Sequence, residues 1–202
     1  MATTKGGDMS RRLDAQRQNF EVMALAGGLG ILAGLGFIVR DLVRIVPNRD
    51  VPVPVDLATM PHDVLLGGTA AAQATEAVIR VSDLRPVPYA AVLTAALLPT
   101  LVLMMVAACF AVLGRSFASG DFFAPAGLRA MKVTSITLVF GSVVIPTLQV
   151  MAANSALASV GVDFGQRMGT DWVLFAGGLL LGSAWYAFQR GARLQRDTEG
   201  LV

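Results

Sequence analysis

The sequence has very few of the side chains that metal centres and acid–base catalysts use. Among 202 residues there is one cysteine, Cys109, and one histidine, His62. A single cysteine excludes an internal disulfide and a cysteine-based metal cluster, and a zinc site needs three or four ligands. His62 lies beside Asp63 without a visible nucleophile, so we interpret it as a solvated loop residue, and Cys109 as a small residue of an apolar segment. We therefore expect no catalytic residue, no metal and no cofactor.

Charged residues are also scarce, and this scarcity indicates the class of protein. Charged residues make up 15% of the chain and hydrophobic residues 54%, whereas soluble domains carry about a quarter charged residues. The formal net charge of +2 is too small to indicate nucleic-acid binding, so we expect no direct contact with nucleic acid. The composition favours a membrane protein.

Four apolar runs predict four membrane-spanning helices. The run from Val22 to Val39 contains no charged residue, and at about 1.5 Å per residue it nearly crosses a hydrocarbon core of about 30 Å. Three later runs also lack ionisable residues. The predicted spans cover residues 21–46, 88–113, 133–153 and 172–188. We predict an all-α integral membrane protein that forms a single membrane domain over residues 1–202.

The distribution of basic residues predicts the orientation of these spans. The N-terminal segment 1–20, the loop between the second and third spans, and the tail 189–202 share one side and carry ten of the 16 Lys and Arg residues. Cytoplasmic loops are enriched in Lys and Arg. Both termini are therefore predicted to be cytoplasmic, and the loop 47–87 extracytoplasmic.

The loop 47–87 contains two segments typical of β-strands. VPVPVDL starts at Val51 and has prolines that suit an edge strand, and AVIRVSDL starts at Ala77 and is rich in β-branched residues. We predict a small extracytoplasmic β cap, a two-stranded ribbon with a helical turn near TAAAQATEA. Because a two-stranded ribbon is marginal alone, it should lean on the membrane helices.

Small residues recur in the first and fourth spans. Gly28, Gly30 and Ala33 match a G-x-G-x-x-A dinucleotide fingerprint, but the match lies inside an apolar run and not between a strand and a helix, so we interpret it as coincidental. Spacing by four residues is typical of close helix packing. The spans could pack one against four or between two copies in a homo-oligomer, or the glycines could be incidental. The candidate packing residues are Ala26, Gly30, Gly34, Gly178 and Gly182.

The second and third spans each contain a proline followed by a threonine. Pro99 with Thr100 and Pro146 with Thr147 would each free a backbone carbonyl, and the threonine hydroxyl could satisfy it. Two broken helices could line a substrate pocket, as in some transporters. The lack of ionisable residues within the apolar runs argues against a proton wire or an ion site.

The loop SFASGDFFAPAGLRAMK joins the second and third spans. Pro125 suits the first turn of a helix, and the aromatic side chains before it suit the membrane interface. The loop is either a hinge alone or, with the basic tail FQRGARLQRDTEGLV, a docking face for a soluble partner; any single arginine could also anchor to anionic lipid. The candidate docking residues are Phe122, Phe123, Arg129, Arg190, Arg193 and Arg196.

The same two segments carry a family resemblance. GDFFAPAGLRAMK, residues 120–132, and the terminal residues 188–202 resemble the corresponding segments of a bacterial four-span family catalogued as domain of unknown function 2975. Ala124 departs from the family's usual serine-like helix cap and could weaken that helix start by about 1 kcal/mol. The resemblance implies a bacterial plasma-membrane location and, by analogy, a helix-turn-helix regulator as the soluble cytoplasmic partner.

These observations lead to two hypotheses of different classes. We expect a multi-pass membrane protein that acts without catalysis as a regulatory or accessory component, with the lipid bilayer and a soluble cytoplasmic protein as partners. The alternative is a small transporter or channel subunit with a pocket near Pro99 and Pro146.

Overall fold

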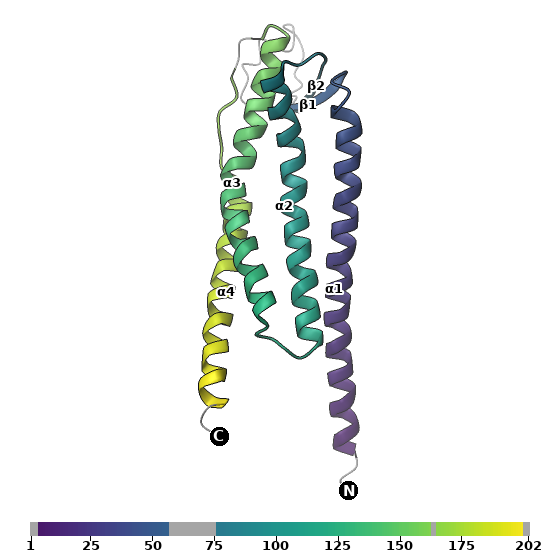
Figure 1. Cartoon of the computed structure of the whole chain (residues 1–202), viewed down its shortest axis with the longest axis vertical. Helices are drawn as coiled ribbons and strands as arrows, with labels where there is room; N and C mark the ends of the chain where they lie inside the picture. The colour runs from purple at the N-terminus through teal and green to yellow at the C-terminus, as the bar shows by residue number, and fades with distance from the viewer. Residues whose placement is uncertain (1–3, 57–75, 163–164, 200–202) are drawn as a thin grey trace, which may run out of the picture. The chain divides into compact units, whose positions relative to one another are not determined.

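The computed structural model describes residues 4–56, 76–162 and 165–199. It is mostly helical, with one two-stranded sheet between the first two helices (Figure 1). The elements in chain order are α1 (Thr4–Ile45), β1 (Val51–Asp56), β2 (Glu76–Val81), α2 (Pro86–Ala118), α3 (Pro125–Ser159) and α4 (Trp172–Glu199). His62 and most of the predicted helical turn near TAAAQATEA lie outside the described residues.

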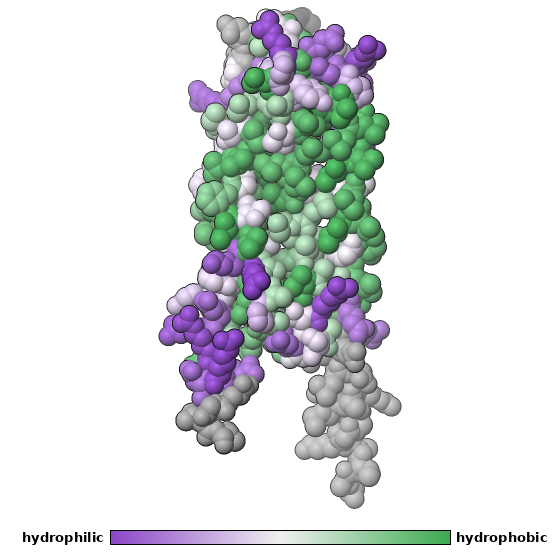
Figure 2. Space-filling view, viewed as in Figure 1, coloured by the Kyte–Doolittle hydropathy of each residue, from purple (hydrophilic) through white to green (hydrophobic). Residues whose placement is uncertain are grey.

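All four helices are long and apolar enough to cross a membrane, as predicted. The apolar segments lie within Gln18–Ile45, Pro86–Ala118, Pro125–Ser159 and Trp172–Thr198. Large apolar side chains cover much of the helix surfaces, and polar residues gather near the helix ends (Figure 2). Leu29, Leu32, Phe140 and Leu180, for example, are each at least 65% exposed. Such side chains would be unfavourable in water and suit contact with lipid.

The helices extend further than the predicted spans. α1 begins at Thr4, within the predicted cytoplasmic segment 1–20, and α4 continues to Glu199, through most of the predicted tail 189–202. The apolar pattern predicts only the part of a helix that could lie in hydrocarbon, whereas Arg, Gln and Glu are also good helix formers and continue it. The connection between α2 and α3 is therefore only residues 119–124.

A glycine ends α2 before the short connection to α3. Gly120 has φ +82°, its N–H donates to the Phe117 carbonyl at 3.1 Å, and the Asp121 N–H donates to the Ser116 carbonyl at 3.0 Å. This pair of bonds is the Schellman motif, which needs a left-handed residue at the position of Gly120. α3 then starts at Pro125, as predicted, because proline fits the first turn of a helix.

The predicted two-stranded ribbon is confirmed. β1 and β2 pair antiparallel, with Val51 opposite Val81 and Asp56 opposite Glu76. The three valines of β1 are at most 1% exposed, whereas its two prolines occupy the alternate positions on the other face. Because alternate pairs in an antiparallel ladder make no hydrogen bonds, two prolines of the same parity need not interrupt the ladder.

The chain divides into two compact units. Unit 1 contains residues 1–35, 101–141 and 172–202, and unit 2 contains residues 36–100 and 142–171. In unit 1 the buried residues Cys109, Leu113 and Met131 form the core, with Trp185 packed against them. In unit 2 the valines of the ribbon pack with residues of α2 and α3 into apolar clusters. The ribbon therefore leans on helices, as its small size requires.

Pro146 frees one backbone carbonyl in α3, and a residue far along the chain uses it. A proline cannot donate to the carbonyl four residues earlier, which here belongs to Ser142. That oxygen accepts a hydrogen bond from the Asp171 N–H at 2.8 Å. The prediction that the neighbouring threonine would satisfy it is wrong at this position, because the Thr147 hydroxyl donates instead to the Val143 carbonyl at 2.8 Å.

Glycines bring α1 and α2 into backbone contact within unit 1. A Cβ atom on Gly27 would lie 2.5 Å from the Ala107 carbonyl oxygen and 2.5 Å from the Ala111 nitrogen. A Cβ atom on Gly114 would lie 2.6 Å from the Ala24 nitrogen. These distances leave no room for a side chain at either glycine.

The predicted packing glycines contact neighbouring helices, but not in the predicted pairing. Gly30 and Gly34 face Ala107 and Met104 of α2, while Gly178 and Gly182 face α3; Ala26 is exposed. None of these glycines makes the contact expected between the first and fourth spans, because each faces the helix that is adjacent in sequence. Packing between two copies stays a prediction.

Candidate functional site

Five phenylalanines join the α2–α3 connection to α1 and α4 at one end of unit 1. Ring centroids are 5.4 Å apart for Phe20 and Phe117, 5.3 Å for Phe117 and Phe122, and 6.0 Å for Phe123 and Phe188. We call these five residues the aromatic junction. Edge and offset contacts at such separations contribute about 0.5–1.5 kcal/mol per pair beyond simple burial. The junction therefore holds the connection against both helices.

Gly191 of α4 makes room for one ring of the aromatic junction. A Cβ atom at this glycine would lie 2.9 Å from Cε1 of Phe123. Phe123 is half-buried, whereas Phe122 is 43% exposed. Both candidate docking phenylalanines therefore have a packing role inside the chain, and only Phe122 presents a large part of its surface outward.

The candidate docking arginines of α4 lie next to the aromatic junction. Arg190 and Arg193 line a surface hollow of about 370 Å³ with Tyr186, and Arg196 lines a hollow of about 190 Å³ with Asp121. All three arginines are exposed, and none forms an ion pair within the described part of the chain. They form a basic surface whose charge is free to act on another molecule.

The basic residues of α3 differ in their surroundings. Arg129 is exposed, so it adds to the charge of unit 1 available to a partner. Lys132 instead lies over the Trp185 ring, with its Nζ 5.5 Å from the ring centroid. This geometry is a cation–π interaction, which uses the lysine charge to join α3 to α4.

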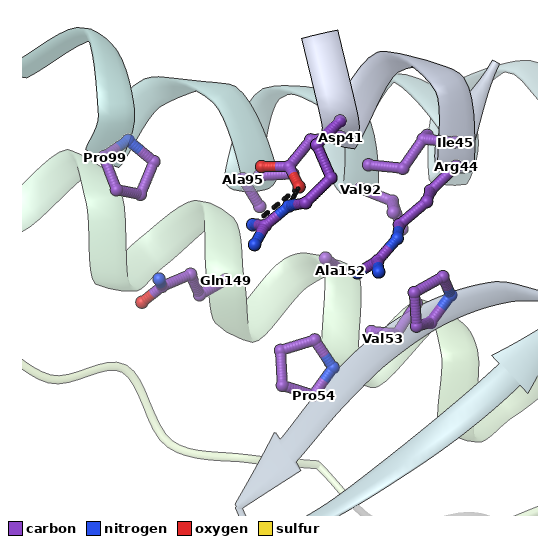
Figure 3. A pocket seen from close by; sticks show the side chains of 13 residues that line it. Asp41, Arg44, Ile45, Val53, Pro54, Val92, Ala95, Pro99, Gln149 and Ala152 are labelled. Atoms are coloured by element: carbon purple, nitrogen blue, oxygen red, sulfur yellow. Dashed lines mark hydrogen bonds and ion pairs between the residues drawn. The ribbon is translucent and has the colours of Figure 1, made fainter. Parts of the chain in front are cut away.

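A second candidate site is a pocket in unit 2. Its volume is about 310 Å³, at the low end of the range of about 300–1,000 Å³ typical of small-molecule sites. The end of α1, strand β1, the first half of α2 and the second half of α3 supply its lining (Figure 3). Pro99 lines it and Pro146 does not. The pocket expected near both prolines thus has only one of them in its wall.

The polar lining of this pocket comes mainly from the last two turns of α1. Arg40 and Asp41 form an ion pair, with the Nη2–Oδ1 distance 2.9 Å and the Nε–Oδ1 distance 3.0 Å. The Arg40 guanidinium also lies 5.0 Å from the Phe37 ring centroid. In Figure 3 the Arg44 side chain extends toward Val53 of β1. The charges of Arg40 and Asp41 offset each other, whereas Arg44 has no acidic partner among the described residues.

Sequence reasoning missed this pocket for a specific reason. Arg40, Asp41 and Arg44 follow the charge-free run from Val22 to Val39, and that run predicts a membrane span but no binding role for the charged residues after it. The spacing of Arg40 and Arg44 did indicate a shared polar face, because residues four apart lie on one face of a helix. The opposing residues Pro99 and Gln149 come from two other helices, and no local pattern in the sequence predicts that tertiary contact.

Neither the metal-ligating side chains in the described part of the chain nor comparison with known proteins indicates a further site. Among the residues whose side chains the structure describes (18–56, 76–162 and 165–198), no group of three or more His, Cys, Asp and Glu could hold a metal ion. Cys109 is buried in the core of unit 1. The chain matches no family model, no curated protein and no solved structure, so the resemblance to the four-span family stays a prediction.

Proposed function

We propose that the protein is a multi-pass membrane component that acts without catalysis by docking a soluble cytoplasmic protein on the basic surface of unit 1. Its expected location is a bacterial plasma membrane, with both termini in the cytoplasm. A regulatory or accessory role follows from this arrangement. The soluble partner should present an acidic surface, because three exposed arginines of α4 outnumber its one exposed aspartate, Asp197, among the described side chains.

The aromatic junction is the observation that carries the proposal. Phe20 stands near the start of the apolar part of α1, Phe122 in the α2–α3 connection, and Phe188 near the end of the apolar part of α4. Their contacts, including 6.0 Å between the Phe20 and Phe122 centroids, place these three points side by side. In a membrane they would lie on one side, which supports the predicted common side for both termini and the α2–α3 connection.

The orientation can be tested with single cysteines. In a Cys109→Ala background, Ser82→Cys in unit 2 should react with a membrane-impermeant maleimide added to whole cells. Ser119→Cys, after α2, should react only once the cells are permeabilised. Both native serines are exposed. Labelling of both sites in intact cells, or the reverse pattern, would contradict the proposed topology.

Docking can be tested by photo-crosslinking from a residue beside the arginines. Leu194 is 63% exposed and lines the same hollow as Arg190 and Arg193, so p-benzoylphenylalanine placed there should crosslink to a soluble protein. Exchange of both arginines for glutamate should abolish that adduct, and exchange for lysine should largely retain it. Arg80→Glu on the exposed face of β2 is the control. An adduct with lipid alone, or one that survives charge reversal, would refute docking.

A transporter or channel subunit is the second candidate function. The pocket at Pro99 supports it, because it contains charged and amide groups beside an apolar helix wall. Flux measured in liposomes that diminishes when Gln149→Leu removes the amide would favour this role. Unchanged flux in that variant would count against a route through the pocket.

A further inference from the structure

The pocket of unit 2 has a charge distribution that selects for one sign of ligand. Arg40 is fixed by Asp41 on one side and by the Phe37 ring on the other. The remaining charged side chain in the lining is Arg44, which is exposed and has no acidic partner within the described residues. The pocket therefore carries one uncompensated positive charge, and a singly charged anion would complement it.

The rest of the lining indicates that the anionic group belongs to a larger molecule with an apolar part. Apolar side chains of Ile45, Val92, Ala95, Ala96 and Ala152 form the walls, and these can pack against hydrocarbon but cannot solvate a small hydrophilic ion. A water molecule occupies about 30 Å³ of liquid, so about 310 Å³ corresponds to about ten waters. This space suits a headgroup and the first few methylenes of a chain, rather than a whole lipid.

Two further groups in the pocket can form hydrogen bonds with a headgroup. Gln149 of α3 lines the pocket (Figure 3), and its amide offers both a donor and an acceptor. Pro99 cannot donate to the carbonyl four residues before it, so the Ala95 carbonyl loses its usual helical partner. Ala95 also lines the pocket. A headgroup that combines one negative charge with hydroxyl groups would satisfy both positions.

The surface of the same helices indicates where such an amphiphile would come from. Val39 and Val43 flank the charged turns of α1 and are 59% and 69% exposed. The acyl chain of an amphiphile could therefore remain in lipid along α1 while the headgroup of the same molecule enters the pocket. We propose that this pocket binds an anionic phospholipid of the bilayer, with the phosphate on Arg44 and the first part of an acyl chain against α2 and α3. This inference is independent of docking on unit 1.

The test is lipid retention by the full-length protein. Protein extracted from nanodiscs that contain equal amounts of phosphatidylglycerol and phosphatidylcholine would be measured by native mass spectrometry. We expect selective retention of phosphatidylglycerol, reduced about tenfold by Arg44→Gln, partly kept by Arg44→Lys, and unchanged by Arg85→Gln, a control at an exposed arginine outside the pocket lining. Gln149→Trp should also reduce retention, because it fills the space from an exposed position.

Cys109 provides the control for folding, since it is the single cysteine and is buried in unit 1. Its reactivity with a maleimide should stay low in every variant used. Equal retention of the two lipids, or full retention by folded Arg44→Gln protein, would overturn the proposal. Decanoate that binds in place of phosphatidylglycerol would overturn the assignment to a bilayer lipid and indicate a free carboxylate amphiphile.

Discussion

The contact between α1 and α2 leads to a sharp prediction about two adjacent glycines. Gly27→Ala would place a methyl group 2.5 Å from backbone atoms of α2, which must shift because a backbone cannot rotate away as a flexible side chain can. Gly28→Ala, one residue later, adds the same methyl group where no atom lies within 4 Å. The two variants therefore change composition and helix propensity equally and differ only in the helix contact.

The expected changes in stability follow from the different surroundings of the two glycines. Overpacking a tight contact costs about 1–3 kcal/mol, whereas an alanine in an open helical position gains up to about 1 kcal/mol over glycine. For a chain of 202 residues, 1 kcal/mol corresponds to about 2–4 °C in the unfolding midpoint. Because both variants gain the same helix propensity, Gly27→Ala should unfold about 2–12 °C below Gly28→Ala, and Gly28→Ala should unfold at or above the midpoint of the unchanged protein.

Cys109 makes the assay possible without an added label. It is the single cysteine and is 4% exposed in the core of unit 1, so a fluorogenic maleimide should report its exposure during heating in detergent or nanodiscs. Gly114→Ala should act like Gly27→Ala, since it adds a methyl group against the backbone of α1. The variant with both Gly27→Ala and Gly114→Ala should be destabilised by less than the sum of the two single variants, because one separation of the helices relieves both clashes. Equal midpoints for Gly27→Ala and Gly28→Ala would refute this reasoning.

Three further variants test other contacts. Gly191→Ala should destabilise unit 1 by about 1–3 kcal/mol, because the added methyl group would clash with the Phe123 ring. In a Phe123→Ala background the same change should cost much less, and labelling of Cys109 would measure the stability of each variant in this double-mutant cycle. Asn48→Gly preserves the left-handed backbone (φ 51°) but removes two 3.1 Å hydrogen bonds, one that the Asn48 amide donates to the Leu84 carbonyl and one that it accepts from the Leu84 N–H. The variant should cost about 1–3 kcal/mol and raise amide exchange in the ribbon. Val53→Asp, at a position 1% exposed, should disrupt the ribbon, whereas Val78→Asp, at a position 63% exposed, should be tolerated. Hydrogen exchange of the ribbon amides measures both effects.

The parts of the fold that local physics determines were predictable from the sequence. Absence of charge over 18 or more residues predicts a membrane-spanning helix because charge is costly in hydrocarbon. The prolines of VPVPV suit an edge strand, and the structure forms that strand with its valines buried on one face. Pro125 predicts a helix start because its ring fixes φ. Each of these signals lies within a few residues of its effect.

The contacts between helices were not predictable in the same way. AGGLGILAGLG contains overlapping sets of small residues, and spacing by four selected Ala26 with Gly30 and Gly34. The structure leaves Ala26 exposed and uses Gly27 for the closest approach to the backbone of α2. Spacing indicates which residues share a face, but the face that meets another helix depends on side chains of that helix, such as Ala107. No pattern within one segment contains this information.

Helix length explains how a chain with charge-free spans can still build polar sites. α2 has 33 residues and α3 has 35, so each is about 50 Å long, whereas a hydrocarbon core of about 30 Å needs about 20 residues. In a membrane, each of these two helices would therefore extend beyond the hydrocarbon. Arg44 and Arg193 lie near the ends of α1 and α4 respectively, outside the charge-free runs. The lack of ionisable residues in the charge-free runs thus limits chemistry only within those runs, whereas the helix ends can carry charged sites.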